Sequence, residues 1–157
     1  MKIYLAGFIN GTVLDKCIAW RKQIREHYEN YKGARYPIDF LDPLNSGELD
    51  NIDAKGLTSN LPRNAIVQKD LLSIENADMI IANLDTFGES RTPTGTICEI
   101  AIAWYLRKPI ILISNETNYT QHPFLSYFAS MIVKDVEELL SQKYVNVFFK
   151  AVNSAQY

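Results

Sequence analysis

The sequence predicts an α/β protein with one domain over residues 1–157, a three-layer sandwich around a five-stranded parallel sheet. Its 157 residues, 47% apolar and 22% charged, have the ordinary composition of a globular domain. A strand pattern followed by a helix pattern occurs five times. The strand patterns are continuous apolar runs, typical of parallel strands buried on both faces. We therefore expect a flavodoxin-like or Rossmann-like sheet.

The first half of the chain is expected to contain two strands and two helices. Residues 3–7 form an apolar run before a Gly/Asn/Thr loop, and apolar residues then recur at helical spacing over 14–31. A weaker strand over 38–41 precedes Asp42-Pro43. Residues 44–63 are polar without a period, which predicts a long loop that either covers a substrate or is plain surface. A helix over 64–75 follows.

The second half repeats the alternation three times. An apolar strand over 79–84 and a loop over 85–95 lead to a helix over 96–107. A strand over 109–113 precedes a helix over 123–130. The last pair is a short strand over 131–133 and a helix over 136–140, and no internal repeat or linker interrupts the series.

Charge and cysteine content narrow the class of protein. The formal net charge of −2 provides no basic surplus for binding nucleic acid. Cys17 and Cys98 both fall in helical patterns, which argues against disulfides and favours a cytoplasmic location. With His27 and His122 as the only imidazoles and no ligand spacing, we expect no metal. The longest apolar run is shorter than the roughly 20 residues that span a bilayer, so we expect no membrane partner.

The predicted topology indicates where a site would lie. In parallel α/β sheets, ligands bind beyond the carboxyl ends of the strands, where the winding reverses. In flavodoxin-like order this point lies between the first and third strands. The loops over 7–12 and 85–96 should therefore carry the chemistry.

Glu99 is the only acid in a helix that is apolar nearly all round, so we expect burial of this helix on more than one side. A buried carboxylate must be satisfied or used. In one interpretation, Thr96 and Glu99 form a capping box. In the other, the helix N-terminus holds Glu99 anionic as a nucleophile or base, and Gly95 lets a ligand approach the backbone.

Asp70 is a second acid at a position where the helical pattern predicts a core residue, so it should face inward. It is either functional, or a carboxylate at the rim of the apolar stripe, or a carboxylate that a neighbouring helix satisfies. With Glu99 it would supply the two carboxylates expected for chemistry at an acetal-like carbon. Tyr4, on the first strand, is either a core residue or a hydrogen-bond donor to Glu99.

The edge loops offer further candidates for substrate contact. Phe8, next to Gly7, is either a flat surface for a heterocycle or plain packing. Asp85 either binds a base or sugar hydroxyl or makes a local turn. Arg91 is either an anion contact or a solvated charge.

Three groups of short motifs follow one another along the chain. They are Ile3-Tyr4-Leu5-Ala6-Gly7, then Lys69-Asp70-Leu71 before Asn76-Ala77-Asp78, then Thr94-Gly95-Thr96 before Glu99-Ile100 with Lys108-Pro109 beyond. In this order and spacing the chain resembles the nucleoside 2-deoxyribosyltransferase family over most of its length.

This resemblance implies that Glu99 is the nucleophile, Tyr4 its hydrogen-bonding partner and Asp70 an acid near the sugar and base. It implies small nucleosides and nucleobases as partners and no cofactor. The implied reaction, part of nucleotide salvage, forms a covalent deoxyribosyl ester on Glu99, which a second nucleobase attacks. The resemblance also implies a homo-oligomer built from dimers within hexamers, and an aromatic cluster would suit such contacts. The cluster is formed by Phe124, Tyr127 and Phe128.

The sequence departs from the family pattern in three places. Pro93 stands where the family has a second acid, so we expect Asp85 to take the role of that acid. The asparagine that the family lends from a neighbouring subunit aligns near His122, with Ser126 close by. The family's C-terminal carboxylate also reaches a partner's site. Here the chain ends Ala155-Gln156-Tyr157, where only the final Tyr fits.

Other functions stay open at this point. A related N-glycoside hydrolase would use water as acceptor, and members acting on nucleoside 5′-monophosphates need phosphate donors. The first loop has no cation, which favours unphosphorylated nucleosides. The cytokinin-activating phosphoribohydrolase type has a longer Gly-rich motif that is missing here. In a non-catalytic nucleotide-binding module, Glu99 would be a cap and Asp70 a surface acid. The preferred base and the exclusion of ribose depend on loop geometry.

Overall fold

The computed structural model describes residues 1–9, 14–29, 37–45, 51–53, 56–58, 62–141, 145 and 148. Its main sheet has the order β2-β1-β5-β6-β7, and all neighbouring strands are parallel. The strands are β1 (Lys2–Gly7), β2 (Asp39–Leu41), β5 (Met79–Asn83), β6 (Ile110–Ile113) and β7 (Met131–Val133). The second strand lies outside the first, so the flavodoxin-like prediction is confirmed.

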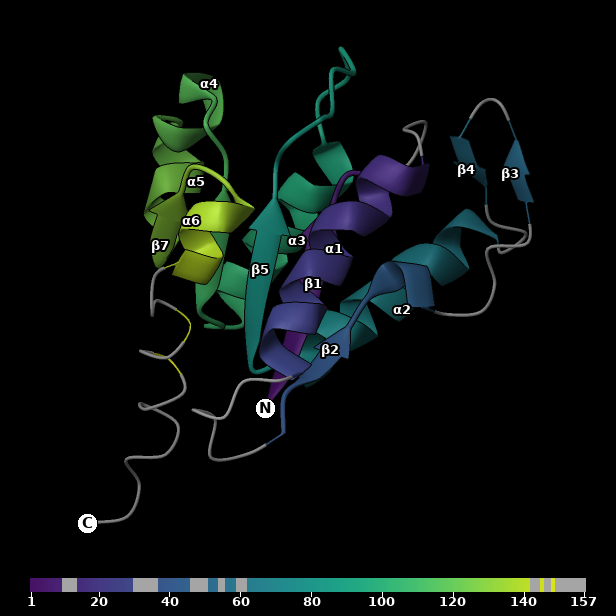
Figure 1. Ribbon diagram of the computed structural model, residues 1–157, viewed down its shortest axis with the longest axis horizontal. Helices are drawn as coiled ribbons and strands as arrows, with labels where there is room; N and C mark the ends of the chain where they lie inside the picture. The colour runs from purple at the N-terminus through teal and green to yellow at the C-terminus, as the bar shows by residue number, and fades with distance from the viewer. Residues whose placement is uncertain are drawn as a thin grey trace.

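Helices cover both faces of this sheet (Figure 1). One face packs against α1 (Leu14–Glu29) and α6 (Val136–Ser141). The other packs against α2 (Arg63–Asn76), α3 (Thr94–Tyr105) and α5 (Pro123–Phe128). Side chains alternate along a strand, so Leu5 faces the α1 side and Tyr4 faces α2 and α3. This alternation puts Tyr4 on the same side of the sheet as Asp70 and Glu99.

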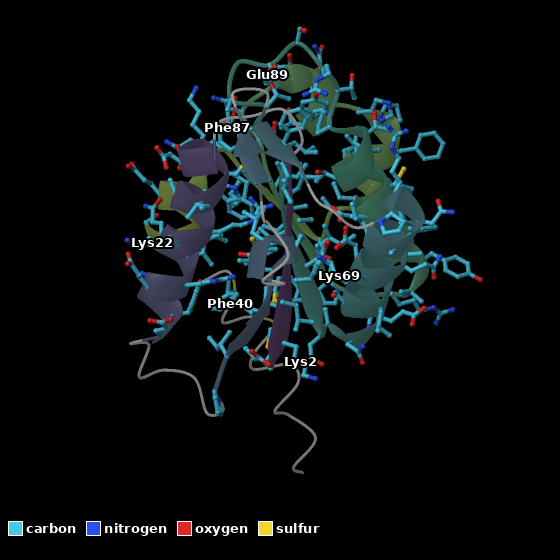
Figure 2. The ribbon with its side chains drawn as sticks, turned by 90° about the vertical axis from the view of Figure 1, so that its right-hand side faces the viewer. Lys2, Lys22, Phe40, Lys69, Phe87 and Glu89 are labelled. Atoms are coloured by element: carbon cyan, nitrogen blue, oxygen red, sulfur yellow. The ribbon has the colours of Figure 1, made fainter. Side chains whose placement is uncertain are left out.

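Every residue of β5 and β6 is buried, which explains their continuous apolar sequences. Lys2 at the start of β1 and Phe87 just beyond β5 lie at opposite ends of the molecule (Figure 2). The carboxyl ends of the parallel strands therefore point toward Phe87. The loops that the topology singled out begin at this edge.

The segment 44–63 is not the plain loop that we expected. A 3-10 turn, η1 (Pro43–Asn45), follows β2, and β3 (Asn51–Asp53) pairs antiparallel with β4 (Gly56–Thr58) in a separate sheet. Strands of three residues are too short to produce a recognisable period. A one-turn helix, α4 (Thr117–Thr120), was also not predicted.

The helix that carries Glu99 begins at Thr94, two residues before its predicted start. Pro93 stands at the N-cap position, and its carbonyl accepts a hydrogen bond of 3.0 Å from the Ile97 amide. The expectation that this helix is buried on more than one side is wrong, because several residues on its outer side are exposed. These are Cys98, Trp104 and Tyr105.

Among the described residues, none of the helices is long and apolar enough to cross a membrane. Within the same residues, no group of three or more His, Cys, Asp or Glu side chains could hold a metal ion.

Candidate active site

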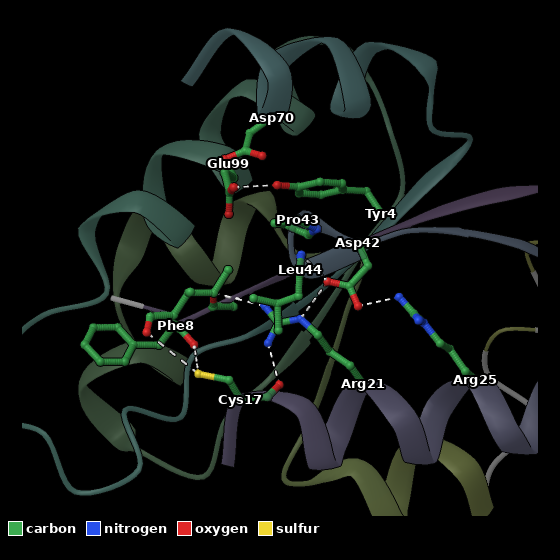
Figure 3. A network of polar contacts seen from close by, with 12 residues as sticks. Tyr4, Phe8, Cys17, Arg21, Arg25, Asp42, Pro43, Leu44, Asp70 and Glu99 are labelled. Atoms are coloured by element: carbon green, nitrogen blue, oxygen red, sulfur yellow. Dashed lines mark hydrogen bonds and ion pairs between the residues drawn. The ribbon is translucent and has the colours of Figure 1, made fainter. Parts of the chain in front are cut away.

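The carboxylate of Glu99 contacts the first strand of the sheet. The Tyr4 hydroxyl donates a hydrogen bond of 2.6 Å to Glu99 Oε1 (Figure 3). Tyr4 is 0% exposed, so the core fixes its ring. The capping-box interpretation is wrong, because Thr96 lies inside the first turn and no side chain caps α3. Glu99 is therefore turned toward Tyr4.

Opposing effects set the ionisation of Glu99. Burial raises its pKa, the Tyr4 hydrogen bond lowers it, Asp70 raises it and Arg21 lowers it, with a result of about 7. Burial also raises the pKa of Tyr4, and the charge of Glu99 acts in the same direction, so the phenol stays protonated as a donor. Glu99 thus changes charge near neutral pH, as carboxylates at functional sites often do.

Asp70 projects from α2 beside Glu99 (Figure 3). Its side chain is 18% exposed, so the inward orientation predicted from the helical pattern is confirmed. Its Oδ1 is buried and has no hydrogen-bond partner among the described residues, although Lys69 Nζ lies 4.0 Å away. Burial raises the pKa of Asp70, and Lys69 partly opposes this. A buried acceptor without a donor is costly, so Asp70 is suited to a donor on a ligand.

A buried ion-pair network lies near these carboxylates, and the sequence analysis missed it. Arg21 in α1 is 1% exposed, and its Nε lies 3.3 Å from Asp42 Oδ1. Arg25 also pairs with Asp42. The sequence did hold a signal, because Arg21 falls between Cys17 and Ile24 on the buried stripe of α1.

Asp85 forms a local turn, which is one of the two roles that the sequence predicted for it. Its Oδ1 accepts a hydrogen bond of 2.7 Å from the Phe87 amide, and its own amide donates to Asn83 Oδ1 at 2.9 Å. It lines a cavity of about 380 Å³ beside α1 and α6, which neither Tyr4 nor Glu99 lines. The structure thus does not bring Asp85 into contact with Glu99, and a role in base binding stays a prediction.

The two candidate glycines differ in their surroundings. A Cβ on Gly7 would lie 2.7 Å from Trp20 Cζ2, so packing against α1 explains this glycine. Only its backbone is left for substrate contact. A Cβ on Gly95 would meet nothing within 4 Å, so no packing reason requires glycine there.

Phe8 and Arg91 come together from two different loops. The Phe8 side chain is 8% exposed, and the Arg91 guanidinium carbon lies 5.6 Å from its ring centroid. The first loop therefore has a cation beside it after all, supplied by the loop that precedes α3.

His122 and Ser126 lie on the outer surface at the start of α5. His122 is exposed and packs against Phe124, and the Ser126 hydroxyl donates to the His122 carbonyl at 2.9 Å. Their roles at a neighbouring subunit's site stay predictions. The C-terminal residues 155–157 lie outside the described residues.

The fold and these groups define an α/β protein with a pair of ionisable carboxylates on the helices that cover one face of a parallel sheet. The family model for nucleoside 2-deoxyribosyltransferase matches residues 3–149, and the chain belongs to this family. Its members are glycosyltransferases or N-glycosidases that act on small nucleosides and nucleobases.

Solved structures of similar fold include three at low sequence identity. BlsM has a TM-score of 0.67 and 18% identity over 99% of this chain and 95% of its own. The CMP N-glycosidase BcmB of Clostridium botulinum has values of 0.58 and 17% over 94% and 99%. The 2-desoxiribosyltransferase of Leishmania mexicana has 0.51 and 22% over 86% and 75%. A comparison with curated proteins finds no significant match.

Proposed function

We propose that the protein transfers a 2-deoxyribosyl group between nucleobases through a covalent ester on Glu99. The observation that carries the proposal is the 2.6 Å hydrogen bond from Tyr4 to Glu99, with the Asp70 carboxylate alongside (Figure 3). The Glu99 carboxylate can attack a sugar carbon, and the Asp70 carboxyl group can exchange a proton with a nucleobase. No cofactor is required, because the bond broken and the bond formed are both N-glycosidic.

In the first step, the Glu99 carboxylate attacks C1′ on the face opposite the base. The C1′–N bond breaks, and the base leaves with the bonding electrons and takes a proton. Asp70 supplies that proton directly or through water, since burial raises its pKa and favours its acid form. Tyr4 holds the attacking oxygen in place and favours its ionised form.

In the second step, a nitrogen of the incoming base attacks C1′ of the ester, and Glu99 leaves as a carboxylate. Asp70 takes up the proton that the incoming base loses. Two inversions at C1′ restore the β configuration, which is the stereochemistry of a retaining displacement.

A second candidate is hydrolysis of nucleoside 5′-monophosphates, in which water attacks the same ester. The position of Arg91 over Phe8 favours it, because a guanidinium beside the first loop is suited to a phosphate. The absence of a cation from the first loop's own sequence no longer argues for unphosphorylated substrates. A purely binding module is less well supported, because Glu99 does not cap its helix.

Incubation with deoxyadenosine and free cytosine separates these activities. Transfer produces deoxycytidine, whereas hydrolysis produces only adenine and the free sugar, and a parallel reaction with CMP and dCMP tests the phosphorylated substrates. Glu99→Ala should abolish both transfer and hydrolysis. Glu75→Ala, at an exposed glutamate of α2, should leave both activities intact. Full transfer by the Glu99 variant would exclude the nucleophile that we assign.

A further inference from the structure

A cavity of about 380 Å³ lies at the carboxyl ends of β5 and β6, beside α1 and α6. Its lining includes Trp20, which packs on the α1 side of the sheet, whereas Tyr4 and its partner Glu99 lie on the α2 and α3 side. The cavity falls in the range of about 300–1,000 Å³ that is usual for sites of small molecules. Neither step of the proposed reaction uses it. We propose that this cavity is a second binding site, for a small organic cation that also carries oxygen atoms able to accept hydrogen bonds.

The Trp20 indole supplies a hydrogen-bond donor without an acceptor. Trp20 is 5% exposed, and its buried Nε1 has no hydrogen-bond partner among the described residues. A Cβ on Gly7 would lie 2.7 Å from Trp20 Cζ2 and 3.4 Å from the Asn83 carbonyl oxygen, so the indole edge that includes Nε1 faces the ends of β1 and β5. Asn83 also lines the cavity. Because a buried N–H group without an acceptor costs stability, the cavity is suited to a ligand that brings an acceptor.

Asn83 and Ser114 add two further donors to the buried part of the lining. They are 3% and 6% exposed. Asn83 Oδ1 accepts a hydrogen bond of 2.9 Å from the Asp85 amide, and Ser114 Oγ accepts one of 3.2 Å from the Glu116 amide. Neither side chain donates a hydrogen bond to any of the described residues, so the Asn83 amide group and the Ser114 hydroxyl hydrogen are left for a ligand. The buried lining is therefore neutral and rich in donors, which matches oxygen atoms on a ligand.

Carboxylates dominate the outer part of the cavity. Among the described residues that line it, four acids face one cation, Lys134; the acids are Asp85, Glu116, Asp135 and Glu137. No group of three or more His, Cys, Asp or Glu in the described part of the chain could hold a metal ion, so these carboxylates do not converge on one point. Carboxylates spread around an opening attract a cation larger than a metal ion and repel an anion.

The two parts of the lining together select the class of ligand. A phosphate or carboxylate would satisfy the buried donors, but the outer carboxylates would repel it. A simple alkylamine would pair with those carboxylates and leave Trp20 Nε1 without an acceptor. An amine that carries hydroxyl or carbonyl oxygens meets both requirements. Phe87 and Ile113 also line the cavity and offer apolar contacts to its carbon skeleton.

The indole N–H of Trp20 reports directly on this site. The chain contains two tryptophans, so ¹⁵N-labelled protein gives two indole signals, and Trp104→Phe identifies the signal of Trp20. Titration with glucosamine, a protonated amino sugar with several hydroxyl oxygens, should shift the Trp20 signal saturably and leave the Trp104 signal in place. Glucose lacks the charge and should bind more weakly, by up to about fivefold for each carboxylate that pairs with the ammonium group. Glucuronate, the anionic counterpart, should not bind.

Variants test the two parts of the lining separately, with binding measured by saturation-transfer NMR of the sugar. The double variant Glu116→Gln/Glu137→Gln, at two exposed positions, should weaken glucosamine binding and leave glucose binding unchanged. Trp20→Phe keeps an aromatic ring and removes the N–H donor, so it should weaken the binding of both sugars. Glu75→Gln, at an exposed glutamate on the other face of the sheet, is the control and should change neither.

A Trp20 signal that glucosamine does not move would overturn the proposal. Equal binding of glucosamine, glucose and glucuronate would also overturn it, as would a Glu116→Gln/Glu137→Gln protein that binds glucosamine like the parent. Because both changes lie at exposed positions, this variant keeps the test valid if Trp20→Phe does not fold.

The inference does not depend on the proposed function, and the two can fail separately. Glucosamine should bind Glu99→Ala as it binds the parent, and saturating deoxyadenosine should not displace it. Displacement by deoxyadenosine would show that the two ligands share one site, and the proposal of a second site would fail while the transferase stands. If the protein neither transfers nor hydrolyses, the shift of the Trp20 signal still decides whether the cavity binds the amino sugar.

Discussion

The Tyr4 hydroxyl lies 2.6 Å from Glu99 Oε1, a contact between residues 95 positions apart in the chain. Because this hydrogen bond favours the ionised form of Glu99, Tyr4→Phe should raise the pKa of Glu99 above about 7. We expect the acidic limb of the pH profile of kcat/KM to move to higher pH, and kcat/KM at pH 6 to fall about tenfold. Tyr105→Phe, at a 79% exposed tyrosine, is the control. An unchanged limb in Tyr4→Phe would remove Tyr4 from the mechanism.

Glu99 should cost the protein stability at neutral pH. Its pKa is about 7 in the folded state, above its usual value of 4.5, so the folded state binds the proton more tightly than the unfolded state. The free energy of unfolding therefore falls as pH rises from about 4.5 to about 7. Glu99→Gln should be more stable than the parent by about 1–3 kcal/mol at pH 8 and nearly equal at pH 4. Urea denaturation of both proteins from pH 4 to pH 8 checks this prediction. A difference in the free energy of unfolding that does not change with pH would contradict it.

Asp70→Asn should slow the step in which the base departs. Loss of a general acid typically costs about 10²–10⁴-fold in rate, and the cost falls when the leaving group needs no proton. We therefore expect a large loss of kcat with deoxyadenosine and a much smaller loss with a 2-deoxyriboside of an acidic phenol. Equal losses with both substrates would show that Asp70 does not protonate the base.

Gly7→Ala and Gly95→Ala form a matched pair. The first places a methyl group 2.7 Å from Trp20 Cζ2 and should destabilise the fold by about 1–3 kcal/mol. The second enters open space in the first turn of α3, so its melting temperature should not fall. A rise in KM for Gly95→Ala alone would indicate a ligand close to that backbone. Equal melting temperatures for the two variants would contradict the packing argument.

The aromatic cluster on α3 and α5 should be a contact between copies of the chain. Trp104, Phe124 and Tyr127 are 42%, 65% and 73% exposed, and Trp104 stacks on Phe128 with ring centroids 4.7 Å apart. Tyr127→Glu should produce smaller species in sedimentation velocity. Leu72→Glu, at an exposed leucine of α2, serves as the comparison. A parent protein that sediments as a monomer would contradict this expectation.

Much of the fold could be predicted because it depends on local patterns. Continuous apolar runs identified the buried strands of the main sheet, a weaker pattern identified the edge strand β2, and the alternation of strands with helical patterns predicted a parallel sheet of flavodoxin-like order. Asp70 was noticed because it interrupts an apolar stripe. The hairpin of β3 and β4 escaped prediction, because three residues per strand carry no period.

Local patterns along the chain suffice to predict the sheet, the edge at which chemistry is expected and the two acids that do not fit an apolar environment. The pairing of Glu99 with Tyr4 instead of with its own helix end depends on packing, because Thr96 and Tyr4 are both plausible partners until the strand and helix come together. Packing alone paired Arg21 with Asp42 and placed Arg91 over Phe8. Such contacts join residues distant in the chain, and their energies depend on separation and burial, which no local pattern records.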